Sequence, residues 1–546
     1  MTRGVGCQGT MKMSKVVNLD ALIQREDFLA TKGVDEAGLG GKSEITLTDL
    51  TKGASFFLTL RKPDFQRETA AWTPEAVRDF IKAFIDGDLI PAVICWQSPQ
   101  RLSFVIDGAH RLSAVIAWLL DDYGDGTESV KFYGNKIPDE QRRIAKRTKE
   151  LVDDEIGAYA AYKAETENPN SNPKLTAGAR ALAFSKIPLL WIRGSDSTKA
   201  ERAFLTINRS AVEIDQTELK ILNSRFKPNA IASRAIVRNA TGHKYWKVFS
   251  ETAQQELEAT AREINSALYS PPLVTPIKSL DLPIAGHGYG SQTLPLIFDF
   301  VNIANGLPVL DASRSKVKRQ SQKTEIKHDP PDEGATLEVM RRAAKLTRRM
   351  TGVHPSSLGL HPAVYFYAAN GRHQPTAVLA MAALIVDLIE EDKLIAFTLA
   401  RAAFETFLIE HKFFVNQLTT QTGSMAKGYR QLRDYLRFVL DRIIASKPAE
   451  EILADFAGHE TLRKLVNQQP IKSTQSKPFS QDLKQWAFLH EALSKSFECA
   501  LCKARMDTKS MQLHHDVELS KGGLGSGDNA KWTHPFCNST YALYIG

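Results

Sequence analysis

The stretch Phe104-Val105-Ile106-Asp107-Gly108-Ala109-His110-Arg111-Leu112-Ser113-Ala114-Val115 decides the fold of the first half of the chain. An apolar run ends at an Asp-Gly pair, and apolar residues then recur at helical spacing, which predicts a strand, a tight turn and a helix. Such a turn directs backbone N–H groups at the space above the helix N-terminus, where an anion is favoured. Arg111 adds a guanidinium that can hold a phosphate, although an Asp-Gly turn with a solvated arginine is also common without any ligand.

The surrounding sequence predicts an α+β multidomain protein. Short β-rich runs at 92–96, 103–106 and 187–191 alternate with helical patterns at 74–85 and 111–120, which gives an α+β domain over residues 45–225. Residues 226–467 read as a mostly helical domain, with apolar residues at helical spacing in 377–389, 394–408 and 429–444. Residues 1–44 are expected to form an N-terminal extension, 311–334 a basic exposed loop, 468–480 a linker and 481–546 a small C-terminal domain.

Composition narrows the class of protein. The chain has 546 residues, with 70 Lys and Arg against 62 Asp and Glu, and the net charge of +8 suits a polyanionic partner. Residues 314–349 hold eleven Lys and Arg against five Asp and Glu, which fits either a nucleic-acid contact or a solvated helix face. The five cysteines are too few for a secreted disulfide framework, no signal peptide is visible, and the longest apolar run, 377–386, is too short to span a membrane. The sequence therefore predicts a cytoplasmic protein without a membrane partner.

Two ligand pairs stand near the C-terminus. Cys499-Ala-Leu-Cys502 is followed by His534-Pro-Phe-Cys537, so each pair encloses two residues. Paired knuckles of this spacing fit tetrahedral Zn²⁺, which can hold together a module too small for a core of its own. The four residues are therefore predicted to bind a structural zinc ion, the alternative being incidental cysteines.

The residues between and after these pairs resemble the HNH endonuclease family. They are His514-His515-Asp516, Gly522-Gly523, Asn529 and, directly after Cys537, Asn538. The resemblance implies a ββα-metal fold that hydrolyses phosphodiesters with a divalent ion such as Mg²⁺ or Mn²⁺. It makes His515 the general base, Asn529 the residue that orients it, and His514 with Asn538 the ligands of the catalytic metal. His514 replaces the commoner Asp of the family, which favours a nitrogen-preferring ion such as Mn²⁺.

Three segments of the first half resemble the ParB-like N-terminal domain of GmrSD-type restriction enzymes. They are Pro63-Asp64-Phe65-Gln66-Arg67, the Asp107–Arg111 element, and Glu201 to Arg209, in which Arg209 follows Asn208 directly and so departs from the family pattern. The resemblance implies a ParB/sulfiredoxin-like fold that binds and often hydrolyses a nucleoside triphosphate, GTP or ATP. The nucleotide-site candidates are Gln66, Arg67, Asp107, Gly108, His110, Arg111, Asn208 and Arg209.

Together the two resemblances predict a nucleotide-regulated HNH endonuclease or nickase of bacterial anti-phage defence. Its substrate would be invading DNA, with modified DNA included. Other defence proteins and a second copy of the chain are further candidate partners. Two alternatives stay open: a protein that senses modified DNA or a partner while its zinc module is only structural, and a nuclease directed at RNA.

Overall fold

The structure is a computed structural model of the chain. It describes residues 16–28, 41–64, 66, 69–134, 137–168, 172–194, 197–211, 224–288, 293–309, 330–422, 425–465 and 479–545. The predicted linker 468–480 and basic loop 311–334 fall mostly outside these residues, as does Cys7.

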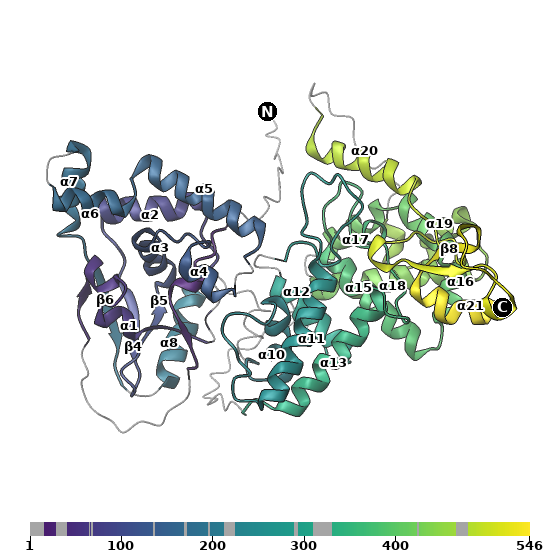
Figure 1. Cartoon of the computed structure of the whole chain (residues 1–546), viewed down its shortest axis with the longest axis horizontal. Coiled ribbons are helices and arrows are strands. Elements are labelled where there is room, and N and C mark those ends of the chain that lie inside the picture. Colours follow the sequence, from purple (N-terminus) through teal and green to yellow (C-terminus); the bar gives the residue numbers. More distant parts are fainter. Residues whose placement is uncertain are drawn as a thin grey trace.

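A six-stranded mixed sheet forms the N-terminal domain, with the strand order β1-β3-β5-β4-β6-β2 (Figure 1). The pairs β1/β3, β3/β5 and β4/β6 are parallel, and β4/β5 and β2/β6 are antiparallel. The strands are β1 (Arg25–Glu26), β2 (Glu44–Ile45), β3 (Leu60–Pro63), β4 (Val93–Gln97), β5 (Ser103–Asp107) and β6 (Ile187–Ile192). The helices are α1 (Ser55–Thr59), α2 (Pro74–Asp86), α3 (Ala109–Leu120), α4 (Thr127–Phe132), α5 (Asp139–Glu155), α6 (Tyr159–Glu167), α7 (Pro173–Leu182) and α8 (Ser197–Ala211).

The local sequence explains where helix α2 begins and ends and which of its side chains are buried. Thr73 caps α2 by accepting a hydrogen bond from the backbone N–H of Ala76, and the helix ends at Gly87, whose φ of 77° is the left-handed conformation that glycine adopts without strain. The side chains that α2 buries recur at three- and four-residue spacing. β5 is buried on both faces, and α8 contributes to a second, smaller apolar cluster beside Phe28 and Trp96. The α+β prediction and the predicted strands and helices of this region are therefore confirmed.

Part of the predicted N-terminal extension belongs to this domain. β1 adds a strand to the sheet beside β3, and Val17, Leu19, Leu22 and Ile23 are buried in the same core as α3. Residues 17–28 are thus an edge of the folded domain rather than a tail, because their apolar side chains fill the end of the sheet.

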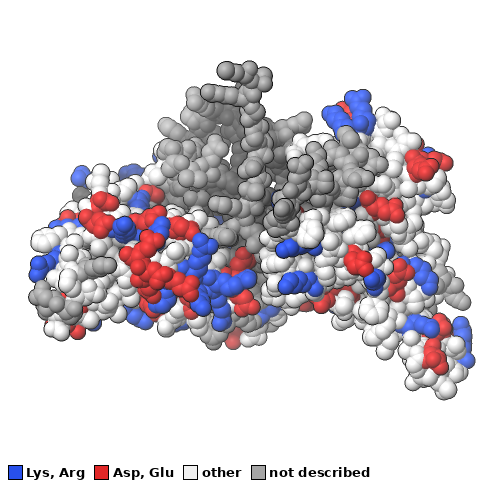
Figure 2. Space-filling model, turned by 90° about the horizontal axis from the view of Figure 1, so that it is seen from above, with Lys and Arg blue, Asp and Glu red and all other residues white. Residues whose placement is uncertain are grey.

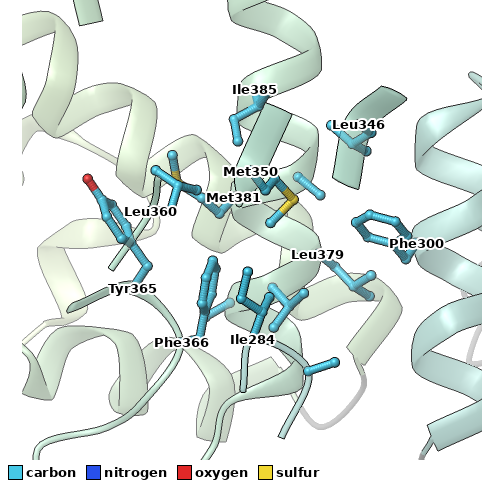
Figure 3. Close-up of a cluster of buried hydrophobic side chains, with 14 of the residues drawn as sticks. Ile284, Phe300, Leu346, Met350, Leu360, Tyr365, Phe366, Leu379, Met381 and Ile385 are labelled. Atoms are coloured by element: carbon cyan, nitrogen blue, oxygen red, sulfur yellow. The ribbon is translucent and has the colours of Figure 1, made fainter. Parts of the chain in front are cut away.

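Ten helices follow among the described residues of 224–465. They are α10 (Pro228–Val237), α11 (Glu251–Tyr269), α12 (Thr293–Ala304), α13 (Glu333–Met350), α14 (Pro362–Tyr365), α15 (Pro375–Glu390), α16 (Leu394–Glu410), α17 (Phe413–Thr422), α18 (Met425–Ile444) and α19 (Ala449–Asp455). The longest apolar run lies in α15, where Ala377 to Ile385 are buried. Figure 3 shows Leu379 and Met381 of α15 packed among Phe300, Met350 and Phe366 in the centre of this domain.

The C-terminal residues pack directly on the helical domain. They form α20 (Gln481–Ser494), the two-stranded sheet of β7 (Gln512–His515) and β8 (Ala530–Thr533), a π-helical turn (Cys537–Tyr541) and α21 (Ala542–Ile545). Cys499, Cys502, Phe536 and Cys537 are buried in the same apolar cluster as the side chains of α15 and α16. The C-terminal residues, yellow in Figure 1, therefore pack against the helical domain.

Within the described residues, no helix combines the length and the apolar character needed to cross a membrane.

Candidate functional site

The β7–β8 hairpin and the helix after it carry the polar residues of the C-terminal prediction. In the antiparallel register His514 lies opposite Lys531 and His515 opposite Ala530. Because side chains alternate along a strand, the two histidines point to opposite faces of the hairpin. His514, His515, Asn529 and Asn538 are each half-buried, so solvent and a substrate can reach them.

His514 points toward the helix that carries Asn538. His514 Nδ1 lies 2.8 Å from Asn538 Oδ1, and Asn538 Nδ2 donates to Gln512 Oε1 at 3.4 Å. Neighbouring ligand atoms of an octahedral ion are about 3 Å apart when each bond is about 2.1 Å. The spacing of these two atoms therefore fits adjacent ligand positions of one divalent ion, and the imidazole nitrogen favours Mn²⁺ over Mg²⁺.

Asn529 fastens the loop that follows His515. Its Oδ1 accepts a hydrogen bond from Val517 N at 2.6 Å, and its Nδ2 donates to the backbone oxygens of Val517 at 3.0 Å and Leu524 at 2.8 Å. These two bonds use both amide hydrogens. The 3.3 Å contact between Asn529 Nδ2 and His515 Nδ1 is therefore a packing contact, and Asn529 holds His515 by fixing the backbone beside it.

Four buried side chains form a metal-binding cluster beneath the hairpin. The ligand atoms of Cys499, Cys502, His534 and Cys537 all lie within 4.8 Å of one another, as a tetrahedral zinc site requires. His534 Nε2 lies 3.1 Å from the backbone oxygen of Arg505 and can donate its proton there. The lone pair of His534 Nδ1 then faces the sulfurs, 3.4 Å from Cys502 Sγ.

The chemistry of the three thiols also fits a cation. Hydrogen bonding to Cys502 lowers the pKa of Cys499, and the same contact raises the pKa of Cys502 to about 12. Hydrogen bonding to Cys499 raises the pKa of Cys537 as well. The three sulfurs thus compete for negative charge, and Zn²⁺, which binds cysteines as thiolates, would stabilise that form of all three. The sequence prediction of a Cys3His metal site agrees with this geometry.

A buried ion pair attaches the cluster to the helical domain. Arg401 Nε of α16 lies 2.8 Å from Glu405 Oε1, and the two side chains are 1% and 0% exposed. Glu405 Oε2 accepts a hydrogen bond from the backbone N–H of Arg505 at 2.7 Å, beside the cysteine pair. Burial alone would lower the pKa of Arg401, but Glu405 outweighs burial and keeps the guanidinium charged. The sequence hides this role, because Arg and Glu four residues apart are a common helix surface pair.

The N-terminal candidates gather where β5 meets α3. Gly108 has a φ of 96° and precedes α3 directly, as the Asp-Gly turn predicts. A Cβ atom at Gly108 would lie 2.7 Å from a methyl group of Val93, so only glycine fits there. Arg111 Nη2 lies 2.5 Å from Asp107 Oδ2, and Arg111 Nη1 donates to the backbone oxygens of Pro91 and, at 3.2 Å, Ala92. The guanidinium is thus turned onto the turn itself, and its binding of a phosphate stays a prediction.

Gln66 and His110 lie beside this turn. Gln66 Nε2 donates to the backbone oxygen of Ile106 at 3.4 Å, and its Oε1 is buried without a hydrogen-bond partner among the described residues. The ring of His110 stacks on Trp72 with centroids 5.7 Å apart. The structure therefore brings two of the three predicted segments together at the β5–α3 turn.

The other nucleotide-site candidates are described only in part. Asn208 and Arg209 lie in α8, but their side chains fall outside the described residues. Arg67 falls outside them entirely.

The sequence did not indicate a buried ionic cluster at the edge of the sheet. Asp20 Oδ1 pairs with Arg25 Nη2 at 2.9 Å and Lys62 Nζ at 2.6 Å. Burial would raise the pKa of Asp20, but the two cations outweigh it and hold that pKa well below its usual range. Arg25 also donates to the backbone oxygens of Pro63, at 3.0 Å, and Gln66. The cluster shapes the Gln66 segment, and no local pattern reveals it because Lys62 is 42 residues from Asp20 in the sequence.

Acidic side chains pair with three of the five basic residues in the described part of the stretch 314–349. Arg341 pairs with Glu256 at 2.7 Å, Arg342 with Glu338 at 2.8 Å, and Arg348 with Glu263 at 2.5 Å. On a different face, seen from above in Figure 2, acidic and basic residues also lie close to one another. These pairs in α13 fit a solvated helix face, and the nucleic-acid contact stays a prediction. Arg314, Lys316, Lys318 and Arg319 fall outside the described residues.

Comparison with known proteins identifies one part of the chain. Residues 47–227 match the family model of the GmrSD restriction endonuclease N-terminal domain. Searches of curated proteins and of solved structures find no match. The match covers four of the six strands, β3 to β6, together with α8 and the turn with Asp107 and Arg111. It supports a restriction endonuclease role in phage defence, with DNA as the substrate. Residues 47–227 are thus similar to the N-terminal domain of the GmrSD restriction endonuclease family.

Proposed function

We propose that the chain is a nucleotide-regulated, metal-dependent HNH endonuclease that cuts or nicks invading DNA. The observation that carries the proposal is the placement of His514 Nδ1 2.8 Å from Asn538 Oδ1, with His515 next in the strand and held by the Asn529 loop. These residues come from a strand, a loop and a helix, so tertiary folding brings them together. A zinc ion at the Cys3His cluster would fix the helix that carries Asn538, which directly follows Cys537.

The side chains can divide the hydrolysis of a phosphodiester between them. His515 takes a proton from the attacking water, a task that suits imidazole near neutral pH. Asn529 keeps the backbone beside His515 in place, so the imidazole need not reorganise during attack. His514 and Asn538 would hold a divalent ion, which supplies charge neutralisation at the phosphate and at the leaving oxygen. Water oxygen bonds to phosphorus as the bond to the 3′ oxygen breaks, leaving a 5′-phosphate and a 3′-hydroxyl.

Nicking of supercoiled plasmid in Mn²⁺ tests the nuclease assignment. His515→Ala should lower the nicking rate about 100-fold or more, the contribution typical of a general base. His490→Ala removes an exposed histidine of α20 and should leave the rate unchanged. If His515→Ala nicks at the wild-type rate, the nuclease assignment is contradicted. The alternative, a sensing protein whose zinc module is only structural, would then be favoured. Faster cleavage of a matched RNA than of the DNA would favour the RNA-directed alternative.

The N-terminal domain is proposed to bind and hydrolyse GTP or ATP. The turn before α3, Gln66 beside it and the family match support this assignment. Asp107→Asn should lower phosphate release at saturating nucleotide while the melting temperature stays near that of wild type. Unchanged phosphate release in Asp107→Asn and in Arg111→Ala would contradict a catalytic nucleotide site at this turn.

A further inference from the structure

The segment that carries Gln66 is also an interface to the helical domain. Asp64, two residues before Gln66, is fully buried, and its Oδ1 accepts a hydrogen bond from the backbone N–H of Phe28 at 3.1 Å. The backbone oxygen of Asp64 accepts a hydrogen bond at 2.8 Å from the hydroxyl of Tyr245, which belongs to the helical domain. A predicted nucleotide-site segment thus contacts the neighbouring domain directly.

One buried arginine joins this segment to a second predicted segment. Arg225 Nε lies 3.2 Å from Asp64 Oδ2, and Arg225 Nη1 lies 2.8 Å from Glu201 Oε1. Glu201 is in α8, the helix that also carries Asn208 and Arg209. Both carboxylates are nearly excluded from water, as is Arg225 with 2% of its side chain exposed. Breaking either pair would leave a charge buried and unpaired, which is costly, so the two segments are held in register.

The helical side of the junction is equally well packed. The guanidinium of Arg234, in α10, lies 4.2 Å from the centre of the Tyr245 ring, and Arg234 Nη1 donates to the backbone oxygen of Arg225 at 3.4 Å. α10 then packs against α11, α12 and α13, the body of the helical domain. Tyr245 therefore touches Asp64 with its hydroxyl and α10 with its ring.

A second set of contacts supports the same interface. His243 Nε2 lies 2.8 Å and Lys247 Nζ 2.6 Å from the carboxylate of Asp27, next to the edge strand β1. β1 pairs with β3, which leads into Asp64. A movement of the Gln66 segment would therefore strain several polar contacts with the helical domain at once.

We propose that Asp64, Arg225 and Tyr245 form a junction through which a nucleotide bound near Gln66 and α8 alters the helical domain. The inference rests on the nucleotide binding proposed above. A triphosphate that draws the Gln66 segment and α8 together shifts both carboxylates that Arg225 holds. The guanidinium of Arg225 and the hydroxyl of Tyr245 must move with these carboxylates and the Asp64 backbone, because both groups are buried and water cannot replace a lost hydrogen-bond partner. α10 receives the displacement and leads into the helices on which the C-terminal residues are mounted.

Tyr245→Phe and Tyr367→Phe are a matched pair of variants that test the junction. Each removes one tyrosine hydroxyl that donates to a backbone oxygen at 2.8 Å, to Asp64 in the first case and to Pro283, within the helical domain, in the second. Asp64 O keeps a contact to Arg25 Nη1 at 3.4 Å, so Tyr245→Phe leaves that oxygen with a donor. Both variants are expected to fold.

Hydrogen exchange of α10 and α11 is measured in the full chain with and without non-hydrolysable GTP and ATP analogues, alongside the dissociation constant of each analogue. In wild type and in Tyr367→Phe, the amide hydrogens of α10 and α11 should exchange at least about threefold more slowly when nucleotide is bound. In Tyr245→Phe the exchange rate should not change with nucleotide, although the dissociation constant of the analogue stays within about threefold of the wild-type value. Nucleotide-dependent protection that persists in Tyr245→Phe would overturn the junction and leave the proposed nucleotide site intact. Wild-type chain that binds neither analogue would overturn the nucleotide site, and the junction with it.

Discussion

Glu405→Gln is predicted to loosen the attachment of the C-terminal residues to the helical domain. The carboxylate accepts three hydrogen bonds, from Arg401 Nε at 2.8 Å, Tyr365 Oη at 2.9 Å and Arg505 N at 2.7 Å. Gln keeps the volume but removes the charge, so the Arg401 guanidinium stays buried without its counter-ion. Loss of one partner of a buried ion pair costs about 3–5 kcal/mol.

The thermal shift follows from that cost. At about 2 °C per kcal/mol for a large domain, Glu405→Gln should lower the melting temperature of the helical domain by roughly 6–10 °C. Differential scanning calorimetry measures this shift. Glu410→Gln, on the exposed side of the same helix, is the matched control and should melt with the wild type.

The double variant Arg401→Met with Glu405→Gln separates ion pairing from packing. It should melt above Glu405→Gln, because it no longer buries an unpaired guanidinium. A Glu405→Gln chain that melts within 1 °C of wild type would refute the reasoning, since the pair would then contribute nothing to the attachment.

Three further predictions concern the C-terminal residues. Gly523→Ala should lower the rate of plasmid nicking at least about tenfold, because the new Cβ would lie 1.8 Å from the backbone oxygen of Val517 and displace the loop beside His515. Gly525→Ala is the control: its Cβ would meet no atom within 4 Å, so this variant should nick at the wild-type rate. Burial raises the pKa of Asp507 to about 6, so the folded chain holds a proton there that the unfolded chain releases, and stability falls as pH rises from about 4 to 6. Asp507→Asn should therefore raise the melting temperature at pH 7.5, with a gain of up to about 3 kcal/mol that vanishes near pH 4; equal gains at both pH values would contradict this. Cys502→Ser should release the bound zinc, measured with a chromogenic chelator, and retention of one zinc per chain would exclude Cys502 as a ligand.

Local patterns explain why part of the fold was predictable. The strand, turn and helix around Asp107 follow from an apolar run, an Asp-Gly pair and a change to helical spacing, all within twelve residues. The Cys3His cluster follows from the C-x-x-C and H-x-x-C spacings, because each pair folds as a short turn. The His514–Asn538 contact was expected only through a family resemblance, because the two residues are 24 positions apart.

Tertiary contacts explain what was not predictable. β1 has two residues, too few for any periodicity, so the segment from Val17 to Phe28 read as a tail. Arg111 looks like a free phosphate ligand in the sequence, and only the fold brings the Pro91 and Ala92 oxygens to its guanidinium. Arg225 and Asp64 are far apart in the chain, and nothing local marks either of them as buried.

Chemical rescue of His515→Gly tests the central claim most directly. With Mn²⁺ and supercoiled plasmid, the variant should nick about 100-fold or more slowly than wild type, and added imidazole should restore part of the rate, with a pH dependence set by the free base. Each nick should be resealed by DNA ligase, because the ends are a 5′-phosphate and a 3′-hydroxyl. Nicking by His515→Gly at the wild-type rate without imidazole would contradict the claim that His515 activates the attacking water.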